Sequence, residues 1–140
     1  LRAMWTMDDP QFHGEFVDFD GIDAYPRPVQ VGGPRLVLGG ATPLALRDAV
    51  ALGTGWYGFG QTPDEVAEAR ELMVLHADAI GRSMESFEIT VTPRARLTTE
   101  LVSAYESAGV DQLVVSVEAD TTEGVRKRLE LNAPATLGIG

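Results

Sequence analysis

Short apolar runs alternate with longer amphipathic segments from residue 34 onward. The short runs have the length and composition of β-strands, whereas the longer segments repeat apolar residues at spacings of three and four, as helices do. Strands are expected at 35–39, 55–60, 86–92 and 111–117, and the first of these strands is expected to be buried. Helices are expected at about 43–52, 63–80, 98–108 and 121–131. This βαβαβαβα order predicts an α/β fold with a parallel sheet and right-handed crossovers.

Two of the expected helices begin with the same dipeptide, Thr42-Pro43 and Thr62-Pro63. A threonine at the N-cap accepts a hydrogen bond from a first-turn amide, and the proline that follows has no amide in need of a partner. Glu65 completes a capping box with Thr62, and Asp120 with Glu123 is a candidate for a second one. Gly109 is expected to end the third helix.

Residues 1–33 have a different pattern, rich in glycine, proline and aromatic residues. The first five residues resemble the last turn of a helix, and EFVDF at 15–19 alternates polar and apolar positions, which predicts a short strand or a hairpin. Pro26 and Pro28 impose an extended backbone. We therefore expect two parts: an irregular or hairpin excursion at 1–33, and four βα units at 34–140.

Composition narrows the class of protein. The net charge is −10, which disfavours binding to a phosphodiester backbone, and the chain has no cysteine for disulfides or thiolate metal sites. We find neither a signal peptide nor a run of about 18 apolar residues, so a cytoplasmic protein without a membrane span is expected. The chain does not begin with Met, so we expect a processed product or a fragment.

The number of βα units leaves two architectures open. A (β/α)₈ barrel needs eight units in about 250 residues, and an open doubly wound sheet usually has five strands. Residues 34–140 hold four units, so they form either a small open sheet or half of a barrel.

Gly39 and Gly40 stand where the first strand meets its helix. Glycine permits a positive φ and a close approach of a ligand to the backbone, and a helix start offers free amides and the positive end of a dipole. Gly39, Gly40, Ala41 and Thr42 are therefore candidates for a phosphate-binding turn. The alternative is a tight strand-to-helix turn without a ligand.

Several spaced motifs resemble one family. They are PRPVQ at 26–30, PRLVLGGATPLALRDAVALGTGWYGFG at 34–60, the Thr-Pro helix start that follows, and the opening LRAMWTMDDPQFHGEFVDF. Together they resemble the carboxyl-terminal half of the bacterial luciferase-like monooxygenases, and especially the branch that is rich in deazaflavin-dependent oxidoreductases. The resemblance extends to about residue 117.

The resemblance implies a TIM barrel whose fifth to eighth strands are the four expected here. It also implies a cofactor, coenzyme F420 or FMN, whose phosphate is held at Gly39, Gly40, Ala41 and Thr42. The Gly-Trp pair of the sixth strand corresponds to Gly55 and Trp56, which are further cofactor-binding candidates.

The chain departs from the family pattern in three respects. Thr54 replaces the Asp before Gly-Trp, and Asp48 replaces the second Arg after the phosphate turn, which lowers the local positive potential. The amino-terminal half of the barrel, which supplies much of the ring-binding wall and most candidate catalytic groups, is absent. Half of such a site is expected to hold phosphate poorly and the cofactor ring hardly at all.

Other chemistry-bearing residues have simpler interpretations. His13 is a candidate substrate-side acid, but a solvated loop histidine is more common. Trp5 and Trp56 are candidates for stacking on a ring cofactor, but packing in the core is the simpler interpretation of both. Arg94 and Arg96 follow the third strand, and they are either an anion site or an exposed pair. Glu118 and Asp120 are candidates for an acid–base pair, but Asp120 is more simply a helix N-cap. His76 is expected at the surface or at the boundary of the core.

Two functions are compatible with these observations. The first is a luciferase-like oxidoreductase or monooxygenase that transfers hydride or oxygen to a small-molecule substrate, together with the missing half-barrel. The second is a non-catalytic half-barrel that pairs with a second copy through exposed strand edges, as a homodimer. The catalytic residues and the substrate are not indicated by the sequence.

Overall fold

The structure is a computed structural model that describes residues 1–138. The chain divides into two compact units, residues 1–35 and residues 36 onward. The last two residues of the second predicted part lie outside the described residues.

The first unit is small and loop-rich. It contains α1 (Arg2–Thr6) and an antiparallel hairpin of β1 (Phe12–His13) and β2 (Asp18–Phe19). Phe12 and Phe19 are paired across the hairpin, with ring centroids 6.3 Å apart. The helical turn and the hairpin agree with the sequence pattern, although the first strand begins before the EFVDF segment.

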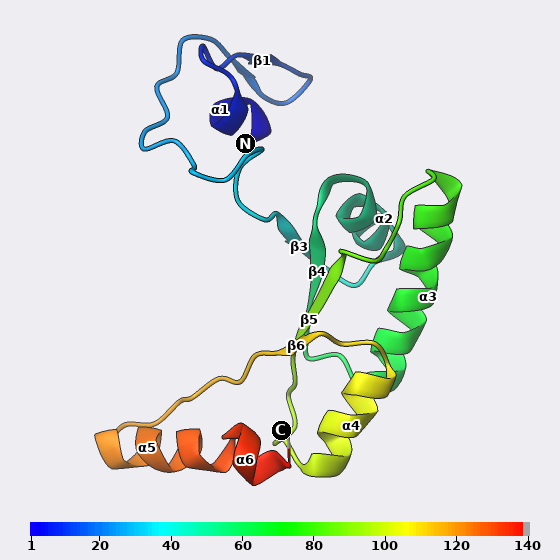
Figure 1. The fold of residues 1–140 in the computed structure, drawn as a ribbon, viewed down its shortest axis with the longest axis vertical. Helices are drawn as coiled ribbons and strands as arrows, with labels where there is room; N and C mark the ends of the chain where they lie inside the picture. The colour runs from blue at the N-terminus through cyan, green and yellow to red at the C-terminus, as the bar shows by residue number, and fades with distance from the viewer. Residues whose placement is uncertain (139–140) are drawn as a thin grey trace. The chain divides into compact units, whose positions relative to one another are not determined.

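The second unit holds a four-stranded parallel sheet in the order β3-β4-β5-β6 (Figure 1). The α/β prediction with parallel strands is therefore confirmed. In chain order the unit consists of β3 (Val37–Gly39), α2 (Pro43–Leu52), β4 (Gly55–Phe59), α3 (Pro63–Ala79), β5 (Glu88–Thr92), α4 (Thr99–Ser107), β6 (Gln112–Leu113), α5 (Thr122–Leu131) and α6 (Pro134–Leu137).

The helix starts form as the sequence predicts. The Thr42 hydroxyl accepts a hydrogen bond from the Ala45 amide at 3.2 Å, and Thr62 with Glu65 forms a complete capping box. Gly109 follows α4 with a φ of +86°.

The second predicted capping box is wrong, because Thr121, not Asp120, caps α5 by accepting the Gly124 amide at 3.1 Å.

The core lies between the sheet and one helical layer. Helices α2, α3 and α4 lie on the same side of the sheet (Figure 1). Because side chains alternate along a strand, Trp56 and Gly58 of β4 face these helices, whereas Tyr57 and Phe59 point to the other side, here called the open face. The buried core consists of Leu46, Ala49, Val50, Trp56, Val66, Ala69, Met73, Ala77, Phe87, Ile89, Val91 and Tyr105.

Two strand predictions need correction. The strand expected to be buried, β3, is an outer strand that pairs, within residues 1–138, with β4 alone, and Val37 on its open face is 41% exposed. The last strand, β6, pairs over Gln112–Leu113 rather than 111–117. Its partner β5 ends at Thr92 and is followed by Pro93, which has no amide to continue the ladder. The short helix α6 follows the last of the helices that the sequence pattern predicts.

Candidate functional site

The Gly-Gly turn lies at the carboxyl end of β3, the edge at which parallel βα folds place their sites. Gly40 has a φ of +107°, and a Cβ at this position would come within 2.8 Å of the Ala45 Cβ. At Gly39 a Cβ would meet only the Tyr57 carbonyl, at 3.6 Å. The turn therefore needs glycine at position 40 for its conformation, and it leaves space above position 39.

The amides at this turn are available to a ligand. Gly39, Gly40, Ala41 and Thr42 are all exposed. Within the described residues, the amides of Ala41 and Thr42 donate to no protein acceptor. They precede α2, a ten-residue helix whose positive dipole end points the same way. A phosphate fits this donor set, and the structure brings all four predicted residues together.

The side chain of Trp56 stabilises the Gly39–Thr42 turn from the core. Its side chain is fully buried on the helix side of β4, and its Nε1 donates to the Gly40 carbonyl at 2.7 Å. The indole therefore fixes the shape of the Gly39–Thr42 turn through the backbone. Its place in the core makes the packing interpretation the better one, and a direct role in cofactor binding stays a prediction.

Gly55 lies elsewhere. It begins β4 and pairs with Val37, two positions before Gly39 in the register of the two strands. A Cβ at Gly55 would approach the Glu88 carbonyl to 2.6 Å, which explains the glycine by strand packing. The structure does not bring Gly55 to the exposed turn, and its assignment to cofactor binding stays a prediction.

Two further residues belong to the site region, and the sequence analysis did not select them. Tyr57 pairs with Gly39 in register, and its hydroxyl is 2.7 Å from the Thr92 hydroxyl at the end of β5. Both side chains lie on the open face. The alternation within GWYGF, which separates Trp56 from Tyr57, is the signal that could have identified them.

The loop after β4 is fixed to its neighbours at the same edge. The Gly60 amide donates to the Thr92 carbonyl at 2.8 Å, and the buried Tyr105 hydroxyl of α4 donates to the Gln61 carbonyl at 2.7 Å. Burial, and then the negative charge of Glu65, raise the pKa of Tyr105 above its ordinary value of 10.0. The phenol is therefore kept neutral, as its donor role requires.

The raised pKa of Tyr105 predicts a loss of stability in alkaline solution. The unfolded chain releases this proton near pH 10.0, whereas the folded chain retains it, so the contribution is complete below pH 10.0 and is lost as pH rises toward the folded-state pKa. Urea unfolding at a series of pH values should show this decline, and Tyr105→Phe should reduce its slope. Tyr25→Phe, at a tyrosine that is 73% exposed, is the matched control and should leave the slope unchanged.

Arg94 and Arg96 line a cavity of about 620 Å³ at the carboxyl end of β5. Lys127 and Arg128 of α5 contribute to the same cavity, as does Glu118. The anion-site interpretation of the two arginines thus gains two further cations that are distant in sequence. Asp120 does not line this cavity, so the structure does not support an acid–base pair with Glu118.

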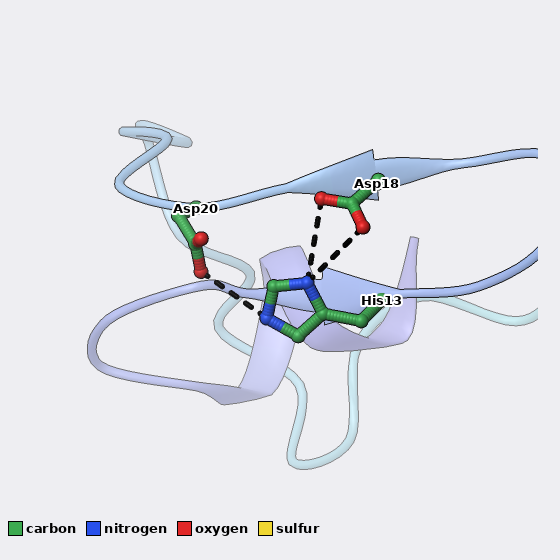
Figure 2. A network of polar contacts seen from close by, with 3 residues as sticks. All are labelled: His13, Asp18 and Asp20. Carbon is green, nitrogen blue, oxygen red and sulfur yellow. Dashed lines mark hydrogen bonds and ion pairs between the residues drawn. The ribbon is translucent and has the colours of Figure 1, made fainter.

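His13 lies in the hairpin of the first unit, between two carboxylates (Figure 2). Its Nδ1 is 3.3 Å from Asp18 and its Nε2 is 3.4 Å from Asp20, and all three side chains are largely exposed. This exposed arrangement fits the interpretation of His13 as a solvated loop histidine. His76 is half-buried on α3, as a boundary residue would be.

Two other classes of site find no support in the described residues. No group of three or more His, Asp or Glu side chains among residues 1–138 is arranged to hold a metal ion. No described helix combines the length and apolar character needed to cross a bilayer.

The comparisons with known proteins agree with this architecture. The model of the luciferase-like monooxygenase family matches residues 1–134. The chain therefore belongs to the luciferase-like monooxygenase family.

Three curated relatives match only part of their own length. An uncharacterized protein of Mycobacterium tuberculosis (strain H37Rv) is 31% identical over 89% of this chain and 42% of its own. The sulfoquinovose monooxygenase of Agrobacterium fabrum is 30% identical over 91% of this chain and 32% of its own. The FMNH(2)-dependent dimethylsulfone monooxygenase of Pseudomonas putida is 35% identical over 41% of this chain and 15% of its own. The chain thus spans about two-fifths or less of these relatives.

A solved structure shows the same fold. An F420-dependent secondary alcohol dehydrogenase, solved with an F420–acetone adduct, superposes with a TM-score of 0.77 at 12% identity, over 96% of this chain and 58% of that enzyme. The four βα units are therefore part of a TIM-barrel architecture, as the sequence resemblance implied.

Proposed function

We propose that this chain supplies the phosphate-binding turn of an oxidoreductase that uses coenzyme F420 or FMN and acts on a small-molecule substrate. The observation that carries the proposal is the exposed Gly39–Thr42 turn, with two unpartnered amides at the start of α2. The F420-dependent alcohol dehydrogenase and the FMNH(2)-dependent monooxygenase among the matched proteins support these two cofactors.

The residues of the turn would hold the cofactor through backbone dipoles. Arg47, the nearest cation on α2, is bonded to Asp48, with its Nη2 2.9 Å from the carboxylate. This ion pair lowers the positive potential that Arg47 adds at the turn, and the amides of Ala41 and Thr42 remain the main donors. The Thr42 hydroxyl accepts from Ala45 and can still donate its own proton to a phosphate oxygen. The bound cofactor would supply the hydride- or oxygen-transfer chemistry.

We further propose that four more βα units complete the barrel, either on the same polypeptide or on a partner. The sheet has two outer strands, β3 and β6, and in the part of the chain that the structure describes each has one edge without a paired strand. On the open face, Phe59 is 62% exposed and Val37 and Val114 are each 41% exposed, as expected for side chains that a completed barrel would cover. The same observations favour the second candidate function, a non-catalytic half-barrel that pairs with its own copy.

A fluorescence titration with F420 or FMN, followed by size-exclusion chromatography, separates these functions. Saturable quenching by the chain supports the cofactor-binding function, and a dimer without quenching supports the second. Thr42→Val should weaken cofactor binding about tenfold, because it removes one hydrogen bond to a charged group.

Thr98→Val is the matched control for this variant. Thr98 caps α4 in the same way, accepting the Leu101 amide at 3.2 Å, so both variants should lose about 1 kcal/mol of stability from the cap. Only Thr42→Val should affect the cofactor. Equal affinities for the two variants would contradict phosphate binding at this turn.

A further inference from the structure

We infer that the chain has a second anion site, formed by Arg94, Arg96, Lys127 and Arg128 around the 620 Å³ cavity at the carboxyl edge of the sheet. We call this the cationic cavity. It takes the phosphate or sulfonate group of a small organic ligand. The inference goes beyond the proposed cofactor turn and does not depend on it, because it rests on other residues.

The distribution of charge is the first argument. The chain has 11 Lys and Arg residues against 21 Asp and Glu residues, yet four of those 11 cations line one cavity. Among the described residues that line it, Glu118 is the only acidic one. In such an acidic chain, a concentration of positive charge at one place is not the result of average composition, and it attracts anions.

The lack of protein counterions is the second argument. Among residues 1–138, the four side chains form no hydrogen bond or ion pair with another protein group. By contrast, Arg27 and Arg47 bind carboxylates, and Arg82 binds the Val50 and Gly53 carbonyls. Like charges held near one another repel, and an anion from solution would relieve this repulsion.

The placement of Arg94 is the third argument. Its side chain lies against Gly60, which has a φ of +76°. Any Cβ at position 60 would overlap the Arg94 Nε, so the glycine makes room for the guanidinium. Gly60 is in turn tied to the Thr92 carbonyl at 2.8 Å. The loop after β4 therefore holds Arg94 at the edge of the sheet.

The shape and lining of the cavity indicate the ligand class. Its volume is in the range of small-molecule sites, about 300–1,000 Å³. Leu97, Val115 and Leu131 add apolar surface beside the cations, which suits an organic molecule that carries the anion. Arginine forks match tetrahedral oxyanions, and the loops after the last two strands of barrels often bind phosphate.

The site differs from the cofactor turn in position. Gly39 ends β3, and Arg94 follows β5, two strands away. Two strand spacings amount to about 10 Å. A ligand in the cationic cavity can therefore be bound at the same time as a phosphate at the Gly39–Thr42 turn.

Isothermal titration of the full 140-residue chain with inorganic phosphate, without any flavin or deazaflavin, tests the inference. We expect saturable binding that is weakened at least tenfold by the double variant Arg94→Gln/Lys127→Gln, because two charge-assisted contacts are removed. Arg126→Gln is the matched control. It removes one positive charge from α5, the helix that carries Lys127, but outside the cavity lining, and should weaken binding less than twofold.

Three outcomes would overturn the inference. They are the absence of saturable phosphate binding, equal weakening by Arg126→Gln, and binding that Thr42→Val abolishes while the double variant retains it. The third would place the phosphate at the cofactor turn. The four side chains are largely exposed, so folding should be unaffected, and thermal melts of each variant check this. If the double variant does not fold, single Arg96→Gln provides the same comparison.

Discussion

Trp56→Ala should lower the free energy of unfolding by about 3–5 kcal/mol, the cost of truncating a fully buried tryptophan. The Trp56 side chain is 0% exposed and lies in the core between β4 and the helices. Its loss leaves a cavity at the centre of that core and also leaves the Gly40 carbonyl without its 2.7 Å donor. Urea unfolding, monitored by circular dichroism, measures the change.

Trp56→Phe separates the two contributions of this residue. Phenylalanine keeps much of the apolar volume but cannot donate a hydrogen bond, so we expect a smaller loss of stability and a weakened phosphate turn. The cofactor titration reports the second effect. If Trp56→Ala costs less than about 1 kcal/mol, Trp56 does not occupy the core as described.

Gly40→Ala should weaken cofactor binding at least tenfold and cost about 1–3 kcal/mol of stability, since it forces a side chain into a sparsely populated conformation. The φ of +107° is unfavourable for any residue with a Cβ, and that Cβ would lie 2.8 Å from the Ala45 Cβ. The first turn of α2 must then shift, and the amides of Ala41 and Thr42 shift with it. Fluorescence titration and thermal unfolding measure the two effects.

Gly81→Ala is the control for backbone strain alone. Gly81 follows α3 with a φ of +66°, and a Cβ there would meet nothing within 4 Å. It should cost about 1 kcal/mol and leave cofactor binding unchanged. A Gly40→Ala protein that binds F420 and FMN with unaltered affinity would show that the turn does not hold their phosphate.

Local sequence chemistry was sufficient to predict the βα units. Thr-Pro identifies the starts of α2 and α3 to the residue, because an N-cap hydroxyl and a proline at the next position are strong local signals. The Gly-Gly turn was predicted for the same reason. Its conformation depends on one residue and on the helix start beside it.

Tertiary contacts determined what the sequence could not predict. The apolar run at 111–117 has the composition of a strand, yet β6 is short because β5 provides no partner beyond Thr92. The run at 35–39 has the composition of a buried strand, yet Val37 is exposed because it lies on the open face of the outer strand β3. The cationic cavity is lined by residues that are distant in sequence, and the path of the chain after β6 brings Lys127 and Arg128 to it. The sequence therefore indicates only half of its cations, Arg94 and Arg96.

The sequential strand order has a consequence for folding. Within the β3-β4-β5-β6 sheet, β4, β5 and β6 each pair with the strand that precedes them in the chain, and paired residues such as Leu38 and Trp56, or Val91 and Leu113, are only 18 and 22 positions apart. A nascent chain that leaves the ribosome can therefore add one βα unit at a time to a growing sheet, without waiting for a distant segment.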